Sequence, residues 1–145
     1  MENASKALML AAEVLLGVLL LTLMVFAFQE LRNFSDTVNE NIQAKTIAEF
    51  NAQFTKYEAK TNLTAQDVIT IGNLAKNYNE SQESVQIRVL VQGVEARFSN
   101  AHTLTQSQVY EFINQYSMEN KVYFECVSVH YNDETKKIDQ VNLKK

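Results

Sequence analysis

The residue types that most often carry out chemistry are sparse in this chain, which has one cysteine and two histidines. A thiol beside an imidazole can act as a nucleophile, and a thiol with further Cys or His ligands can hold zinc. Cys126 lacks a second and third ligand at a spacing typical of zinc sites, and His102 and His130 are isolated from it. Cys126 instead lies among alternating apolar residues, as buried cysteines do. We therefore expect no catalytic residue and no metal ligand.

Carboxylates and glycines indicate no site either. Asp133 and Glu134 are adjacent acids in a turn-like segment, where solvation accounts for them, whereas an acid/base pair needs an apolar pocket. The three glycines are isolated from one another, so the chain has no glycine-rich phosphate loop. We expect no cofactor-binding residue, no small-molecule substrate and no enzymatic activity.

Three segments match the acceptor pattern for N-glycosylation, in which Ser or Thr follows two residues after Asn. A three-residue pattern occurs often by chance, and the first of these segments would lie within two turns of a membrane surface. We interpret all three as helix caps and loop residues: Asn33–Ser35, Asn62–Thr64 and Asn79–Ser81.

The longest apolar stretch is Ala7–Phe28, in which Glu13 is the one strongly polar side chain and Thr22 the one other polar side chain. As a helix of 22 residues it would span ~33 Å, which matches the hydrocarbon core of a bilayer. Its eight Leu, three Val and two Phe residues favour insertion by about 4 to 8 kcal/mol. A central carboxylate opposes insertion by roughly 2.5 to 3.5 kcal/mol, so the stretch is predicted to cross the bilayer.

Glu13 has two interpretations. It lies near the start of the span, and helical side chains lean toward the N-terminus, so its carboxylate can reach the nearer membrane surface. Alternatively, Glu13, Gly17, Leu20 and Met24 share one face of the helix, and Gly17 lets a second backbone approach closely. The second interpretation makes this face a helix–helix contact within the membrane.

A cleaved signal peptide is the alternative to a retained anchor. Val14–Phe26 has the length of an h-region, and small residues in Val25–Ala27 would permit cleavage near Ala27 and release a secreted domain. Against cleavage, the segment before the h-region carries Glu2 and Glu13, and the whole apolar run is longer than a typical h-region. We expect the anchor to be retained.

Charge bears on partners and on orientation. The formal net charge of −4 lacks the basic excess that binding to phosphate backbones requires, so no nucleic-acid partner is expected. Lys6 and the α-amino group precede the span, and only Arg32 follows it closely, which favours a cytoplasmic N-terminus and an extracytoplasmic C-terminal domain. A single cysteine permits no intramolecular disulfide, so packing must hold that domain together.

The anchor helix has no stop signal at the membrane surface, since the chain has no proline and no glycine between Gly17 and Gly72. We expect one helix, continuous or once bent, from about residue 5 to about residue 57. Beyond the span, its apolar residues are spaced mostly three and four apart and are expected to pack on the core of the following domain: Leu31, Phe34, Val38, Ile42, Ile47, Phe50, Phe54 and Tyr57.

Two shorter helices are expected after the long one. Thr64 can cap the first, with Asp67 placed to stabilise its first turn, and a polar loop is expected over residues 77–84. Thr103 or Thr105 can cap the second. The apolar stripe of that second helix comprises Val109, Phe112, Ile113 and Tyr116.

Strands are expected where apolar and polar residues alternate or where β-branched and aromatic residues gather. These segments are residues 84–91, 94–98, 121–131 and 136–143, the last two joined by a turn over 132–135. The expected fold class is α+β, with helices packed on one face of an antiparallel sheet of three or four strands. The expected parts are a membrane anchor over 1–30, an amphipathic continuation of the helix over 31–60, and a head domain over 61–145.

The opening residues Met1–Leu8, the span that follows at once, and the segment Glu49–Glu58 resemble a group of small, uncharacterised bacterial membrane-anchored proteins. The likeness covers roughly the first half of the chain and the start of the next helix. It implies a bacterial single-pass protein and brings no activity or functional residue with it.

The layout is also similar in outline to type IV pilins and pseudopilins, in which a long N-terminal helix is both membrane anchor and spine of an α+β head. Those proteins have Gly or Ala before the processing site and Glu five residues into the mature chain. Counting back from Glu13 places Leu8 before the cut and Met9 after it, which departs from that pattern. The likeness therefore implies a shared architecture and not shared processing.

Two functions without catalysis fit these features. In the first, the chain is a structural or assembly subunit, pilin-like or secretion-associated, whose anchor associates with its own kind or with a partner membrane protein. In the second, it is a membrane-tethered binding or accessory module whose head recognises a protein or ligand outside the membrane. The uninterrupted helix with Glu13 and Gly17 on one face favours the first.

Overall fold

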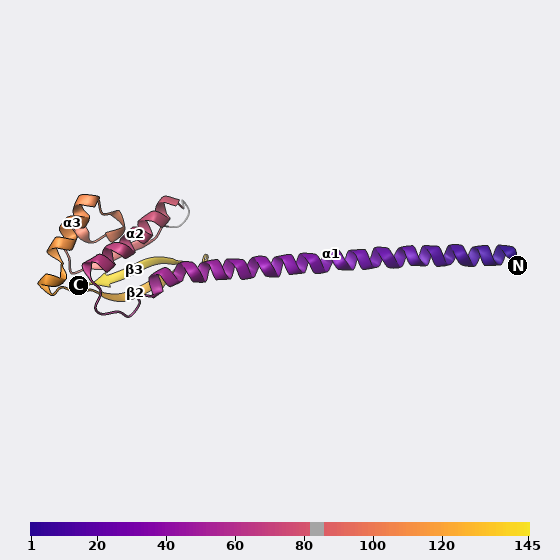
Figure 1. Ribbon diagram of the computed structural model, residues 1–145, viewed down its shortest axis with the longest axis horizontal. Helices are drawn as coiled ribbons and strands as arrows, with labels where there is room; N and C mark the ends of the chain where they lie inside the picture. Colours follow the sequence, from indigo (N-terminus) through magenta and orange to yellow (C-terminus); the bar gives the residue numbers. More distant parts are fainter. Residues whose placement is uncertain (82–85) are drawn as a thin grey trace. The chain divides into compact units, whose positions relative to one another are not determined.

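The computed structural model describes residues 1–81 and 86–145 of the chain (Figure 1). The chain forms two compact units, Met1–Lys45 and Thr46–Lys145. The fold class is α+β, as expected, with a long helix followed by shorter helices and a three-stranded sheet. The helices are α1 (Glu2–Thr55), α2 (Ala65–Ser81) and α3 (Gln106–Gln115), and the strands are β1 (Arg88–Gln92), β2 (Glu125–Tyr131) and β3 (Ile138–Lys144).

The first unit, Met1–Lys45, is helical from Glu2 onward. The long helix expected from about residue 5 to about residue 57 is confirmed, because α1 runs without interruption to Thr55. An 18-residue window within α1 has a mean hydropathy of 2.5, and none of that window is buried. The helix is thus long and apolar enough to cross a membrane, a property that signal sequences share.

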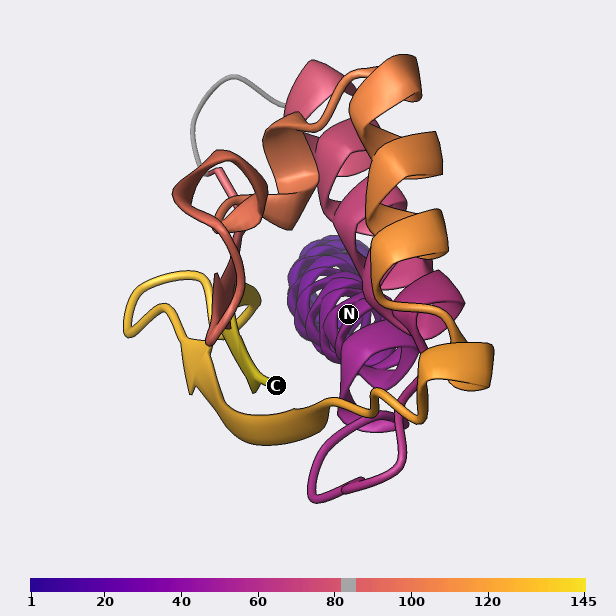
Figure 2. The ribbon, with the colours of Figure 1, turned by 90° about the vertical axis from the view of Figure 1, so that its left-hand side faces the viewer.

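The second unit, Thr46–Lys145, is the head, and its sheet has the strand order β1-β3-β2. The expected hairpin is confirmed, since β2 and β3 pair antiparallel. The expectation of a fully antiparallel sheet is wrong, because β1 pairs parallel to β3. Parallel strands cannot be joined by a hairpin turn and need a longer crossover connection. Here the connection from β1 to β3 contains α3 and β2. Figure 2 shows α2 and α3 side by side, with the strands on the other side of the head.

Aromatic side chains form much of the core of the head. Phe98 and Phe112 pack edge to face with ring centroids 5.5 Å apart, and Phe112 stacks on Phe124 at 5.7 Å. Phe54, from the last turns of α1, is 1% exposed and lies 5.6 Å from the ring of Phe50. The head therefore includes the last turns of α1 as part of its core.

The apolar stripe of α1 that was expected to pack on this core does so only in part. Phe54 and Tyr57 are buried, and Phe50 packs against the core. Leu31, Phe34 and Ile42 are exposed, so the expectation is wrong for them. The remaining two, Val38 and Ile47, are half-buried. The spacing gives the reason: Ile42 and Ile47 are five residues apart, a rotation of about 140° on a helix, so one face does not carry both.

Local hydrogen bonds explain where the head's helices begin. The Thr64 N–H donates to Asp67 Oδ2 at 2.9 Å and the Asp67 N–H donates to Thr64 Oγ1 at 3.2 Å, which confirms Thr64 as the cap of α2. Of the two candidates, Thr105 is the cap of α3, with its side chain accepting from the Gln108 N–H. The polar loop expected over 77–84 is wrong up to Ser81, which ends α2, because polar side chains alone do not stop a helix. Its last three residues lie outside the described part.

The strand expected over 84–91 begins instead at Arg88, and its first two residues lie outside the described part. The strand expected over 94–98 is wrong, since Ala96–Phe98 is a 3-10 turn that buries Phe98. The turn brings the chain back beside β1, where the Val91 N–H donates to Ser99 O at 2.8 Å. This contact covers the edge of β1.

The other two expected strands begin later than predicted. Lys121 and Lys136 have positive φ angles of 55° and 58°, which keep the chain out of extended geometry at those points. Accordingly, β2 starts at Glu125 and β3 at Ile138.

Two asparagine side chains pair with backbone groups as a neighbouring strand would. Asn51 of α1 donates from Nδ2 to Lys136 O at 2.9 Å and accepts from the Ile138 N–H at 3.0 Å. Asn79 of α2 donates to Ile87 O at 2.9 Å and accepts from the Ile87 N–H at 2.7 Å. The Asn51 amide links α1 to the start of β3, and the Asn79 amide links α2 to the residue before β1. The bonds of Asn79 account for the late start of β1.

Replacing Asn51 by Ala is expected to lower the free energy of unfolding of the head by about 1 to 3 kcal/mol, because the Ile138 N–H loses its partner beside a buried side chain. Urea unfolding of the full chain in detergent, followed by the near-UV circular dichroism of its aromatic residues, measures this. The matched control is Asn73→Ala at an exposed position of α2, expected to change stability by less than about 0.5 kcal/mol. Equal effects of the two substitutions would contradict the role of Asn51.

Candidate functional site

The four residues expected to form a contact within the membrane all lie on α1 in the first unit. Leu20 and Met24 are 56% and 59% exposed, and Glu13 is exposed as well. A Cβ atom added at Gly17 would meet nothing within 4 Å. The backbone at Gly17 is therefore open to close approach by another helix, and the flanking side chains are available to it.

The same face of α1 continues beyond the apolar span. Leu20 and Leu31 are eleven residues apart, as are Leu31 and Ile42, and eleven residues make three helical turns. The face expected within the span and the apolar residues from Leu31 to Ile42 therefore form one face of the first unit. We call this set the α1 stripe: Glu13, Gly17, Leu20, Met24, Leu31, Phe34, Val38 and Ile42.

Sequence reasoning placed the second half of this face in the head's core, although a signal for its true extent was present. The steps between its downstream members are three, four and four residues, and the next apolar residue, Ile47, breaks that series with a step of five. The break falls between Ile42, which is exposed, and Phe50 and Phe54, which pack in the head.

Cys126 is buried and its backbone N–H donates to Lys60 O at 2.9 Å. Burial raises the pKa of the Cys126 thiol above its ordinary value, and the charge of Glu58 raises it further. Both effects favour the neutral thiol, whereas a nucleophile or a metal ligand is a thiolate. Among the residues that the structure describes, no group of three His, Cys, Asp or Glu side chains is placed to hold a metal ion.

Each histidine is engaged in a contact of the sheet. His102 Nδ1 accepts a hydrogen bond from the Val89 N–H at 3.1 Å, which covers the outer edge of β1. His130 Nδ1 lies 2.7 Å from Asp139 Oδ1 across the β2–β3 hairpin. These contacts stabilise strand edges and give neither imidazole a nucleophile to activate.

A charged network lies on the surface of the head. Arg97 donates from Nε to Glu95 at 2.8 Å and from Nη1 to Glu111 at 2.6 Å, and Gln115 donates to Glu95 at 2.6 Å. The hydrogen bond from Gln115 and then that from Arg97 hold the pKa of Glu95 below its ordinary value. The network joins the turn after β1 to α3, and its carboxylates are occupied by these partners.

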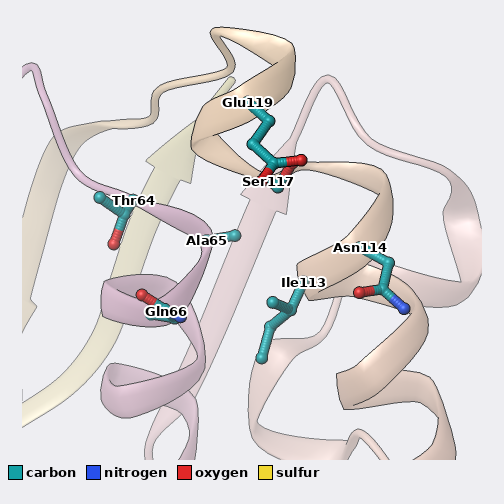
Figure 3. A pocket seen from close by; sticks show the side chains of 7 residues that line it. All are labelled: Thr64, Ala65, Gln66, Ile113, Asn114, Ser117 and Glu119. Carbon is teal, nitrogen blue, oxygen red and sulfur yellow. The ribbon is translucent and has the colours of Figure 1, made fainter.

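A hollow of about 320 Å³ lies between the start of α2 and the end of α3. Figure 3 shows Thr64, Ala65 and Gln66 on one side of it, and Ile113 and Asn114 on the other. The remaining lining residues are Ser117 and Glu119. Five of its seven lining residues are polar, and Glu119 has no second ionisable group there to form an acid/base pair.

The α1 stripe is therefore the strongest candidate site in the described part of the chain, and its residue types suit a contact surface better than a reaction centre. The head offers satisfied structural contacts and open hollows, among them the one lined by Thr64 and Glu119. No protein-family model, curated protein or solved structure matches the chain.

We expect Cys126 to resist a water-soluble maleimide at neutral pH in the folded protein and to react once denaturant exposes it, because burial shields the thiol and raises its pKa. As a control, Ser128→Cys at an exposed position of β2 should add one rapidly labelled thiol, counted by mass spectrometry. Native labelling of Cys126 as fast as that of the control would contradict the buried, neutral thiol.

Proposed function

We propose that the chain is a non-enzymatic, membrane-anchored structural or assembly subunit, with residues 7–28 in the bilayer and the head outside the cytoplasm. The observation that carries the proposal is the apolar part of α1, of which nothing is buried within the chain. Its large side chains, such as Leu15 at 72% and Phe28 at 65% exposure, are the kind that lipid accommodates and water does not.

The orientation follows from the charges that flank the span. Lys6 and the amino terminus lie before it, and Arg32 lies after it, so the excess of positive charge is on the N-terminal side. A cytoplasmic N-terminus then places the C-terminal head outside the cytoplasm. Cleavage near Ala27 is the competing outcome, and it would separate the head from the four stripe residues that lie in the span.

Assembly is supported by the two polar residues of the span. Thr22 satisfies its hydroxyl inside the helix by donating to Val18 O at 2.8 Å. Within the described chain, Glu13 has no such partner, and it lies about half a helical turn around from Thr22 beside the open backbone of Gly17. Ionisable side chains in membrane spans usually face another helix, which makes Glu13 the polar contact of an assembly surface.

The binding module is a second candidate, and the hollow between α2 and α3 favours it. Under that function the long helix serves only as a tether. The two candidates therefore differ in whether the identity of the span matters.

Replacing Glu13 by Ala is expected to weaken self-association about 5- to 30-fold, the equivalent of a lost interhelical hydrogen bond of about 1 to 2 kcal/mol. Chemical crosslinking of the full chain in membranes, titrated by dilution with lipid, measures the association. Since Ala opposes insertion less than an ionised Glu does, a loss of crosslinked species does not arise from a lost anchor. Thr22→Ala on the opposite face is the control and should leave association unchanged; an unaltered pattern in Glu13→Ala removes Glu13 from the contact.

Exchanging residues 7–28 for an unrelated apolar span of equal length separates the two candidates. An assembly subunit should lose most of its crosslinked species, because the stripe residues of the span are gone. A tethered binding module should keep its membrane association and the binding properties of its head, since the head is unchanged. Retention of the crosslinking pattern after the exchange would count against assembly through the anchor.

A further inference from the structure

The part of the α1 stripe beyond the apolar span is an amphipathic surface, most of whose large apolar side chains are exposed. Leu31, Phe34 and Ile42 are 63%, 68% and 57% exposed. The opposite face of the same segment carries the charged side chains of Asp36 and Glu40. A helix with one apolar face and one charged face is stabilised in water when another surface covers the apolar one.

We propose that residues 31–42 pack against the same segment of a second copy of this chain, as a parallel pair of helices. This inference rests on the proposed function, because both copies must be anchored in one bilayer by their N-terminal spans. Two identical anchors inserted in one orientation place equal residues at equal heights above the membrane. Each stripe residue then meets its own counterpart, as core residues do in parallel coiled coils.

The spacing of the stripe suits such a pair. Leu31, Phe34, Val38 and Ile42 follow one another at steps of three, four and four residues, which together make eleven. A period of eleven is about 3.67 residues per turn, close to that of an undistorted helix, so two helices can stay in contact with little supercoiling. The contact therefore continues from Leu20 in the span to Ile42 without a change of face.

The charges beside the stripe select a second copy over a lipid surface. Glu30 and Arg32 lie on either side of Leu31, each about 100° around the helix from it. In a two-fold parallel pair, the flank of one helix that carries Glu30 faces the flank of the other that carries Arg32. A helix that lies on a bilayer is flanked mainly by Lys and Arg, whereas this segment has an acid on one flank and acids on its far face.

The test uses single cysteines in full-length chains in membranes, in a Cys126→Ala background, with an oxidant added. Val38→Cys should form disulfide-linked dimers readily, because equivalent core positions of a parallel pair bring Cα atoms within the range that a disulfide spans. Glu40→Cys, on the opposite face, is the matched control and should give at least about tenfold less dimer. Leu20→Cys reports the contact within the span.

The outcomes separate this inference from the proposed function. Dimer from Leu20→Cys without dimer from Val38→Cys overturns the contact of residues 31–42 and leaves assembly through the span. Equal dimer from Val38→Cys and Glu40→Cys means random collision and overturns it too. A Val38→Cys thiol that forms no dimer and is shielded from a water-soluble maleimide would show that lipid or the head covers the stripe.

A charge exchange tests the choice of partner independently. Glu30→Lys should lower the dimer yield of Val38→Cys about two- to fivefold, as expected for lost exposed ion pairs, and adding Arg32→Glu should restore it. Absence of restoration by the double exchange would overturn the two-fold parallel arrangement. The fraction of each variant in the membrane pellet is measured as well. An equal loss of membrane-bound protein in these variants would show that the substitutions weaken the anchor and not the pairing.

Discussion

The large apolar surface of α1, which the chain itself does not cover, is the constraint on which the other features depend. A folded protein in water exposes apolar side chains singly or in small patches, whereas the hydropathic window of α1 is unburied along its whole length. Such a surface is stable only against lipid or against other helices. Membrane anchoring and the proposed assembly are two ways of meeting that one requirement, and the α1 stripe would combine them on one helix.

The head is stabilised differently, by packing and by hydrogen bonds to its own backbone. Its single cysteine is buried and unpaired, so aromatic contacts around Phe112 and the amide pairs of Asn51 and Asn79 hold its elements together. Phe54 and Asn51 belong to α1. The last turns of that helix therefore contribute a buried side chain to the head's core and hydrogen bonds to the chain at the start of β3. Gly72 shows how close the packing is, because a Cβ atom there would lie 2.5 Å from Ala101 O.

Sequence patterns predicted the features that depend on neighbouring residues. The length of α1, the caps at Thr64 and Thr105 and the β2–β3 hairpin follow from local signals, and the structure has them. The parallel pairing of β1 with β3 depends on a long crossover that no local pattern encodes. Asn79 was interpreted as a cap or loop residue, but its amide binds a residue eight positions away and changes where a strand begins.

The candidate site was predicted in part for a related reason. Helical spacing alone identified Glu13, Gly17, Leu20 and Met24 as one face. Spacing did not show whether Leu31, Phe34 and Ile42 were covered, because amphipathic periodicity is the same for a core face and for an exposed contact face. Only the burial of Phe54 and the exposure of these three residues separated the two cases.

Retention of residues 7–28 in the membrane is the central claim, and the intact mass of the protein in the membrane pellet tests it most directly. The account predicts a species that resists alkaline extraction and whose mass includes the apolar span. A soluble species whose mass begins near Phe28 would contradict it, since the anchor and the four stripe residues within it would be missing from the mature chain.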